Sequence, residues 1–205
     1  MSHVPKSMTL HCTGGTSQIY TVALGAIIRH INDLLESVCL LDLLNPRRKL
    51  FPKGHVGKEL TESCAAYNAV RRCLRRFALS DPKVTVVCVG DGSTPRTAAM
   101  FAFRSKWQAV SVDPELRSRN WGVNRLCCMH TVIEDVKLRY NKVIVVGVHS
   151  HASLARTLDH VKGKDRAVVW IPCCKRVDIE TPPTLEYVDP GIWSPKNRVM
   201  VWERL

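Results

Sequence analysis

The segment from Val84 to Pro114 constrains the fold of this chain more than any other stretch. It begins with an apolar, β-branched run and then turns at Gly90-Asp91-Gly92. An apolar helical pattern follows, and a second apolar run closes on Asp113. Strand, glycine turn, helix, strand and acid, in this order, form the layout of half of a nucleotide-binding sheet. The segment therefore predicts an α/β fold built on a parallel sheet.

The two glycines of this turn, Gly90 and Gly92, allow the backbone to bend tightly and to approach a ligand without an intervening Cβ atom. Asp113 follows the turn by about 20 residues, where a carboxylate can accept hydrogen bonds from both hydroxyls of a ribose. Together these residues predict a nucleoside-containing ligand. The alternative is a parallel-sheet core in which the glycines serve packing only.

The chain beyond this segment continues the pattern. We predict buried strands at 125–131, 142–148 and 166–171 from their apolar runs. Two further strands, at 184–188 and 198–202, are joined by a loop rather than a helix, which implies an antiparallel pair. The predicted fold is therefore α/β, with a Rossmann-like, mostly parallel seven-stranded sheet, helices on both faces and a C-terminal antiparallel β-hairpin.

The length of 205 residues suits one α/β domain at 58–205 with a helical extension at 1–57. The chain contains 30 Lys and Arg residues against 18 Asp and Glu residues, a formal net charge of +12. This excess favours a polyanionic partner, RNA first and an acidic surface second. The alternative is a basic surface that contacts only solvent.

The predicted helix Lys58–Leu79 concentrates positive charge on one face. Four arginines lie within six residues, and we call them the arginine patch: Arg71, Arg72, Arg75 and Arg76. Such a patch suits contacts with the phosphates of a nucleic acid. It is equally consistent with a solvated helix face.

The N-terminal extension reads as mostly helical. Apolar residues recur at three- and four-residue steps from about Thr16 to Leu44, and Asn45-Pro46 is expected to end the helix. This helix could form a lid or dock a protein partner. There is no signal-peptide pattern, and no run approaches the ~20 apolar residues that cross a bilayer. We therefore expect a cytoplasmic protein without membrane contact. The alternative is that the acid-poor first thirty residues target an organelle, although they are not rich in arginine.

The nine cysteines include two adjacent pairs, Cys127-Cys128 and Cys173-Cys174, but no Cys-x-x-Cys motif. Several lie within apolar runs, which indicates buried, reduced thiols in a cytosol-like compartment rather than a disulfide framework. No zinc-ligand spacing is present, so no metal is expected.

From about Lys58 to Leu205, five strand–helix units and a terminal hairpin resemble the class I S-adenosylmethionine-dependent methyltransferase fold. The resemblance implies S-adenosyl-L-methionine as the cofactor. Asp113 matches the acid that binds the ribose hydroxyls in this family. The family's glycine motif, which passes under the methionine and ribose, is matched by Gly90, Asp91, Gly92, Ser93 and Thr94. Two positions differ: Cys88 replaces the usual acid before the turn, and Thr94 replaces a third glycine.

The resemblance implies roles for residues after the later strands. Glu134 or Asp135 falls where the family meets the adenine amino group, and Val148 begins the segment beside the transferred methyl. A narrower likeness concerns tRNA 2′-O-methyltransferases of the Cys-Cys-His type. It rests on Gly147-Val148-His149 and Pro172-Cys173-Cys174-Lys175, in which Lys175 replaces the expected histidine.

His149 and His151 are the predicted catalytic residues, because an oxygen nucleophile benefits from a base and imidazole titrates near neutral pH. The alternative is that they cap the next helix or bind loop carbonyls. The expected function is methyl transfer to RNA or an RNA-associated protein. A catalytically inactive RNA- or protein-binding module is the second hypothesis. An NAD-dependent oxidoreductase is disfavoured, because the last glycine of the dinucleotide fingerprint is missing.

Overall fold

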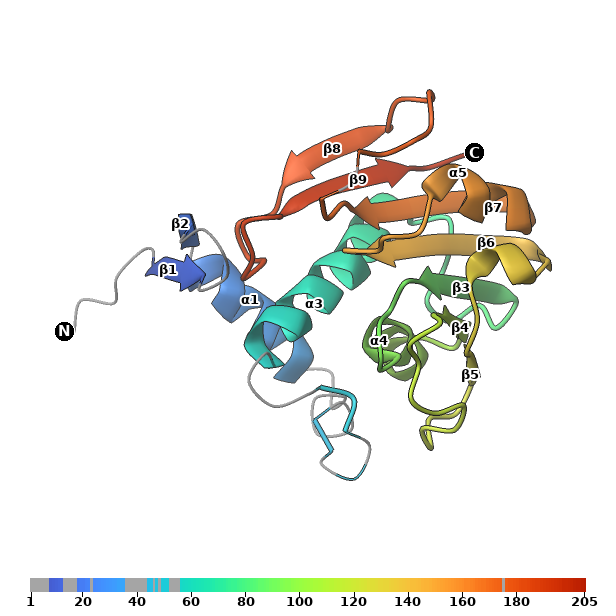
Figure 1. Ribbon diagram of the computed structural model, residues 1–205, viewed down its shortest axis with the longest axis horizontal. Coiled ribbons are helices and arrows are strands. Elements are labelled where there is room, and N and C mark those ends of the chain that lie inside the picture. The colour runs from blue at the N-terminus through green and yellow to red at the C-terminus, as the bar shows by residue number, and fades with distance from the viewer. Residues whose placement is uncertain are drawn as a thin grey trace.

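Seven strands form one sheet in the order β5-β4-β3-β6-β7-β9-β8 in the computed structural model (Figure 1). The first five are parallel neighbours, whereas β9 is antiparallel to both β7 and β8. The strands are β3 (Val84–Val89), β4 (Gln108–Val112), β5 (Leu126–Met129), β6 (Leu138–Val148), β7 (Val161–Ile171), β8 (Leu185–Val188) and β9 (Arg198–Trp202). The structure describes residues 8–12, 18–22, 24–35, 44–45, 47, 49–51, 56–174 and 176–205. The predicted sheet and its C-terminal hairpin are confirmed.

Helices cover both faces of this sheet, as predicted. On one face lie α3 (Val56–Cys73) and α4 (Arg96–Arg104), and on the other lie α5 (Leu154–His160) and the single-turn η1 (Ile133–Asp135). All six residues of β3 are buried, and the five apolar ones divide between the two cores, with Val84, Val86 and Cys88 in one and Val87 and Val89 in the other. A strand buried on both faces needs apolar residues at every position, which is why β3 reads as a continuous β-branched run.

Not every strand is followed by a helix, so the expectation of five strand–helix units was wrong. Among residues 56–174 and 176–205, α4 follows β3 and α5 follows β6, but 113–125 and 172–184 form turns and loops. Most of segment 115–124 is polar and exposed, and so it lacks the apolar stripe that a packed helix needs. The helix expected to reach Leu79 ends at Cys73.

The N-terminal extension is only partly helical. β1 (Met8–Cys12) pairs antiparallel with β2 (Gln18–Val22), and α1 (Leu24–Leu35) follows. The predicted helix therefore begins eight residues later than Thr16, because the Thr-, Ile-, Tyr- and Val-containing run of β2 favours a paired strand. Most of 36–46 lies outside the described residues. In the described part of the chain, no helix has both the length and the apolar character to cross a membrane.

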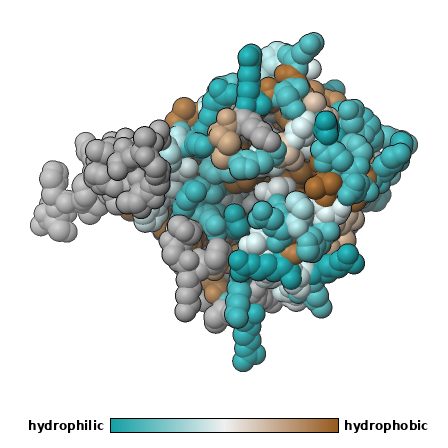
Figure 2. Space-filling model, viewed as in Figure 1, coloured by the Kyte–Doolittle hydropathy of each residue, from teal (hydrophilic) through white to brown (hydrophobic). Residues whose placement is uncertain are grey.

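The carboxyl ends of the parallel strands meet at one edge of the sheet, and the loops that follow them surround a hollow there. Figure 2 shows that most coloured residues on the visible face are hydrophilic, with hydrophobic residues near its middle. In open α/β sheets, ligands bind at this edge, where the strand order reverses. In this chain the reversal lies between β3 and β6, because β4 and β5 extend the sheet to the other side.

Candidate functional site

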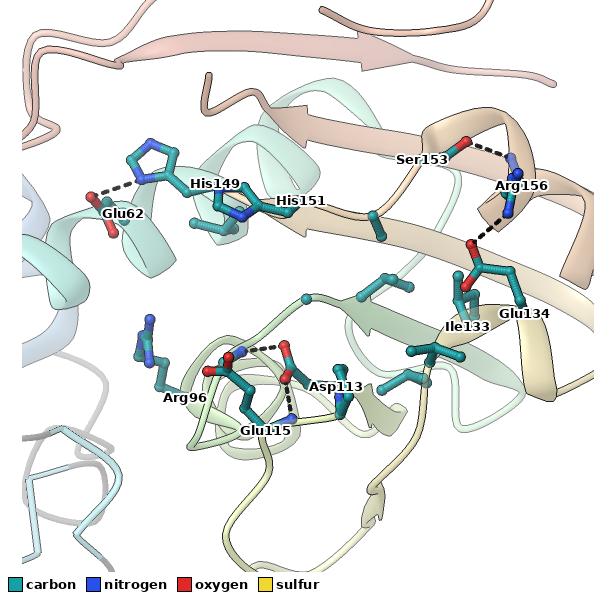
Figure 3. A pocket seen from close by; sticks show the side chains of 18 of the residues that line it. Glu62, Arg96, Asp113, Glu115, Ile133, Glu134, His149, His151, Ser153 and Arg156 are labelled. Atoms are coloured by element: carbon teal, nitrogen blue, oxygen red, sulfur yellow. Dashed lines mark hydrogen bonds and ion pairs between the residues drawn. The ribbon is translucent and has the colours of Figure 1, made fainter. Parts of the chain in front are cut away.

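A pocket of about 820 Å³ opens at the carboxyl edge of β3, β4 and β6 (Figure 3). Its volume lies within the range of small-molecule and cofactor sites. It brings together seven of the predicted site residues from four separate segments: Gly90, Gly92, Asp113, Glu134, Val148, His149 and His151. The predicted ligand residues after β3, β4, β5 and β6 therefore converge on one cavity.

Two residues of the glycine turn, Gly90 and Gly92, line this pocket. Gly90 and Gly92 have φ angles of +72° and +80°, which L-residues with a side chain rarely adopt. A Cβ atom at Gly90 would also lie 2.8 Å from the Cβ atom of Ser150, because the ends of β3 and β6 pack closely there. At Gly92 a Cβ atom would meet only the Arg96 guanidinium, at 3.6 Å. Gly90 is therefore required by both conformation and space, and Gly92 by conformation alone.

Asp113 links the end of β4 to this turn. Its Oδ2 atom accepts a hydrogen bond from the Gly92 N–H at 2.8 Å, and its Oδ1 atom accepts one from the Glu115 N–H at 2.7 Å. The residue is 7% exposed and lines the pocket. A carboxylate offers about four lone-pair sites, so these two bonds leave acceptor capacity for a ligand with two hydroxyls.

The side chain of Asp91 bonds to the start of α4. Its carboxylate accepts hydrogen bonds from the N–H groups of Thr97 and Ala98, each at 3.1 Å, and from the Ser111 hydroxyl at 3.2 Å. It thus satisfies free N–H groups in the first turn of α4, where a negative charge is favoured. Burial raises the pKa of Asp91 despite the nearby Arg96 guanidinium. The side chain does not line the pocket.

The last two residues of the glycine motif also lie outside the pocket lining. Thr94 is 2% exposed, and its hydroxyl donates to the Leu50 carbonyl at 2.6 Å and accepts from the Arg96 guanidinium at 3.2 Å. It therefore attaches the segment before α3 to the start of α4. Ser93 is partly buried, and its carbonyl accepts from the Arg117 N–H at 3.1 Å.

Of the two acids predicted near the adenine, the structure brings only Glu134 to the pocket. Its Oε1 atom lies 3.6 Å from an Arg156 guanidinium nitrogen, an ion pair visible in Figure 3. Asp135 is exposed and accepts a hydrogen bond from the Thr131 hydroxyl at 3.1 Å. Beside Glu134, the buried side chain of Ile133 gives this end of the pocket an apolar wall.

His149 is held on both sides of its ring. Nδ1 lies 3.1 Å from the Glu62 carboxylate, and Nε2 lies 2.8 Å from the Lys196 carbonyl oxygen. Both ring nitrogens therefore face protein oxygen atoms. The backbone has φ +50°, a left-handed conformation in which histidine is enriched. These contacts fit the alternative interpretation that His149 binds loop carbonyls.

His151 differs in its surroundings. It is exposed, lines the pocket, and lies with its Nε2 atom 3.6 Å from the Cys174 Sγ atom. Figure 3 places it between His149 and the pocket's opposite wall, above Asp113. Of the two predicted histidines, His151 is therefore the exposed one.

Several lining residues were not predicted from the sequence. Glu59 and Glu62 lie three residues apart on α3, a spacing that places both on one helix face and that could have suggested a common site. Glu59 forms an ion pair with Arg96 at 3.5 Å. Asp178 lies in a loop after β7, and no pattern in the sequence indicates it.

The charged residues that line the pocket are mostly acidic. The lining contains six carboxylates, Glu59, Glu62, Asp113, Glu115, Glu134 and Asp178, against three Lys or Arg residues, Lys58, Arg96 and Arg156. The pocket is thus acidic in a basic protein.

The arginine patch does not reach this pocket. It begins nine residues after Glu62 on α3, which corresponds to about 14 Å along the helix axis. Three of its members, Arg71, Arg72 and Arg75, are exposed. Arg76 instead pairs with Asp165 at 2.9 Å and donates to the Glu203 carbonyl, which ties the end of α3 to β7 and the C-terminal segment. The prediction that the four arginines share one helix face was wrong, because α3 ends at Cys73, before Arg75 and Arg76.

No protein-family model and no curated protein matches the sequence. Among solved structures, the chain is similar to a mutant of MtNAS in complex with S-adenosylmethionine, with 10% identity and a TM-score of 0.45 over 88% of this chain and 77% of that chain. It is similar to coclaurine N-methyltransferase bound to N-methylheliamine and SAH, with 13% identity and a TM-score of 0.41 over 88% and 61%.

A third similar structure is magnesium protoporphyrin IX methyltransferase (ChlM) from Synechocystis PCC 6803 with bound SAH, with 13% identity and a TM-score of 0.39 over 71% of each chain. Because all three TM-scores are below 0.5, the fold assignment rests on the strand order and pairing of the sheet and not on these likenesses.

Proposed function

We propose that this protein is an S-adenosylmethionine-dependent methyltransferase. The observation that carries the proposal is the position of Asp113, whose carboxylate is bonded to the Gly92 N–H and lines a pocket of about 820 Å³ at the sheet edge. This arrangement joins an acceptor for ribose hydroxyls to a turn that a ligand can approach closely. The cofactor supplies an activated methyl group on a sulfonium centre, and the chain's own residues bind and orient it.

The lining suggests how each part of the cofactor is held. Asp113 would accept the ribose hydroxyls, and Glu134 beside Ile133 would meet the adenine at the apolar end. The methionine part would lie over Gly90 and Gly92, where the nearby Arg96 guanidinium suits a carboxylate. The excess of acidic lining residues favours a cationic ligand over a neutral one. S-adenosylmethionine carries this positive charge on sulfur.

For the methyl acceptor we propose RNA, or a protein bound to RNA. A second cavity of about 410 Å³ lies between the loops that follow β7 and precede β9, and it is lined by three basic residues, Arg176, Lys196 and Arg198. Cys174 lines this cavity and also contacts His151, which lines the first pocket. A phosphate backbone in the basic cavity would therefore lie next to the methyl-transfer site.

His151 is the candidate base for this reaction, and His149 is a positioning residue. An oxygen acceptor loses a proton during methyl transfer, and a base within hydrogen-bonding reach commonly contributes ~10²–10⁴-fold. The ring of His151 is exposed and lines the pocket, where it can take that proton. The ring of His149 contacts Glu62 and the Lys196 carbonyl, and so it helps to hold the pocket wall. The rest of the rate enhancement comes from alignment of donor and acceptor.

A catalytically inactive binding module is the second candidate. Two residues at the glycine motif favour it. Cys88 is a buried thiol, and burial raises its pKa well above the usual value. The Thr94 hydroxyl donates a hydrogen bond to the Leu50 carbonyl. These two residues serve internal structure at positions where the family binds its cofactor. The two candidates differ in whether the pocket binds S-adenosylmethionine.

Calorimetry with S-adenosylmethionine, SAH and NAD separates the candidates. The first requires binding of the sulfur compounds that falls at least about tenfold in Asp113→Ala. Asp135→Ala is the matched control, because Asp135 is an exposed carboxylate outside the lining. No binding of either sulfur compound to the wild-type chain, with RNA binding retained, would establish the inactive module.

The RNA proposal is tested by the salt dependence of RNA binding in charge-reversal variants. Arg176→Glu with Lys196→Glu should weaken binding and reduce the salt slope by about one for each phosphate that the protein no longer neutralises. Arg71→Glu with Arg72→Glu changes the same number of charges at the far end of α3. If only the Arg71→Glu, Arg72→Glu variant binds RNA more weakly, the acceptor does not enter by the basic cavity.

A further inference from the structure

Three potential metal ligands gather at the rim of the pocket. His151 follows β6, and the adjacent residues Cys173 and Cys174 follow β7. Their ligand atoms all lie within 4.8 Å of one another, and the His151 Nε2 atom is 3.6 Å from the Cys174 Sγ atom. In the part of the chain that the structure describes, this is the only such group of three or more His, Cys, Asp or Glu side chains.

The sheet register explains why these residues meet. β6 and β7 are parallel neighbours, and Val148 pairs with Ile171 at their carboxyl ends. His151 and Cys174 each lie three residues beyond this pair, and so the two loops leave the sheet at the same level. The ligands come from different loops, which is why a search of the sequence for Cys-x-x-Cys spacing does not find them.

We infer that His151, Cys173 and Cys174 bind a Zn²⁺ ion. Two sulfur donors and one imidazole form a soft ligand set that suits zinc. Tetrahedral bonds of about 2.3 Å to sulfur and about 2.0–2.1 Å to nitrogen place a sulfur and a nitrogen ligand about 3.6 Å apart. The Cys174–His151 separation is 3.6 Å before any ion is added. On binding, each thiol releases one proton to solvent, and its thiolate forms the bond to zinc.

The surroundings support the same conclusion. The Lys196 ammonium lies 3.6 Å from the Cys173 Sγ atom, where it can donate a hydrogen bond to a zinc-bound thiolate, as outer groups do at metal sites. His151 and Cys174 are exposed, and so an ion can enter from solvent. Two cysteines and one histidine leave the fourth tetrahedral position open, which is typical of catalytic rather than structural zinc. His151 lines the pocket, and so the ion would lie at its rim. An imidazole that binds zinc through Nε2 cannot also accept a proton there, so the base role proposed for His151 belongs to the metal-free chain.

This inference does not depend on the proposed function. The test uses the full chain, purified under reducing conditions, stripped with a chelator and titrated with Zn²⁺ in competition with a chromophoric chelator. Co²⁺ is titrated in parallel, because thiolate ligation gives an intense near-ultraviolet band and tetrahedral geometry gives strong visible bands. The variants are His151→Ala and Cys174→Ser. The matched control is Cys127→Ser, which removes another exposed, free cysteine.

We expect one zinc ion per wild-type chain, and a loss of affinity greater than about tenfold in both ligand variants. Cys127→Ser should bind like the wild type, and all four chains should give the same near-ultraviolet circular dichroism. The inference is overturned if the wild type binds no zinc at micromolar concentration, or if the ligand variants keep full affinity. It is also overturned if mass spectrometry finds Cys173 and Cys174 joined as a disulfide under these conditions. Zinc binding with no S-adenosylmethionine binding would reject the proposed function alone.

Discussion

The Nδ1 atom of His149 lies 3.1 Å from the Oε1 atom of Glu62, and the Glu62 side chain is only 4% exposed. The only other cation near this carboxylate in the described structure is the Lys58 ammonium, at 3.8 Å and about half exposed. A buried carboxylate is costly without a close positive partner. The contact therefore makes His149 important for the stability of the pocket wall, whether or not it takes part in chemistry.

We predict that His149→Asn destabilises the protein by roughly 2–3 kcal/mol, because it leaves the buried Glu62 carboxylate with only the half-exposed Lys58 as a cationic neighbour. Asparagine is chosen because it tolerates the left-handed backbone at this position. Glu62→Gln removes the charge, so the double variant should recover at least about 1 kcal/mol relative to the sum of the single variants. Urea unfolding measures all three free energies. His130→Asn, at an exposed histidine, is the control, and strict additivity would contradict the pairing.

We predict that alanine substitutions at Gly90 and Gly92 lower the free energy of unfolding by unequal amounts. Gly90→Ala should destabilise by more than about 3 kcal/mol, because its Cβ atom would collide with Ser150 in addition to the strained φ angle. Gly92→Ala should cost only about 1–2 kcal/mol, since its new Cβ atom has ordinary contacts with Arg96. Thermal or urea unfolding distinguishes the two. Equal losses would mean that β3 and β6 do not approach each other as closely as described.

The central strands were predictable because burial on both faces imposes a local rule. In β3, β6 and β7 the carboxyl-terminal residues are buried, and β-branched or other apolar side chains fill nearly every position there. The glycine turn and Asp113 were predictable for a similar reason, since their residue types are set by backbone conformation and ligand chemistry. Each of these signals lies within a short stretch of sequence.

The remaining features depend on distant residues. His149 acquires its role from Glu62 and from the Lys196 carbonyl, which lies 47 positions away in the sequence. In the sequence, nothing distinguishes Arg76 from the other arginines of the patch, but in the fold it pairs with Asp165, which is 89 positions away. The β1–β2 hairpin was missed because Ile19 and Val22 also fit helical spacing, and pairing with β1 decides between the two. Periodicity carries no information on such long-range partners.

The buried carboxylate of Asp91 predicts an unusual pH dependence. Burial raises its pKa above the ordinary value of 3.8, so the folded chain holds this proton more tightly than the unfolded chain. The contribution of Asp91 to stability is therefore complete below pH 3.8 and decreases as the pH rises through the raised folded pKa. This sign is opposite to that of a salt-bridged acid. Asp91→Asn should abolish the dependence, as measured by the wild-type minus variant free energy of unfolding across this range.

At pH 7, Asp91→Ala should destabilise by roughly 2–4 kcal/mol. It removes the acceptor for two N–H groups at the start of α4, and it leaves the fully buried Ser111 hydroxyl without this partner. Asp135→Ala, which removes an exposed carboxylate from η1, should change the free energy of unfolding by less than about 0.5 kcal/mol. A loss in Asp91→Ala no larger than in this control would contradict the capping role.

Adjacent residues of a strand point to opposite faces of a sheet, and this gives Cys127 and Cys128 of β5 different reactivity. Cys127 is exposed, whereas Cys128 is 7% exposed and burial raises its pKa to about 12. Because the thiolate is the reactive form, iodoacetamide at pH 8 should modify Cys127 and leave Cys128 free. Mass spectrometry of the peptide that holds both should find one adduct on the folded chain and two after denaturation. Two adducts on the folded chain would mean that Cys128 is accessible, which would contradict the packing of β5 described here.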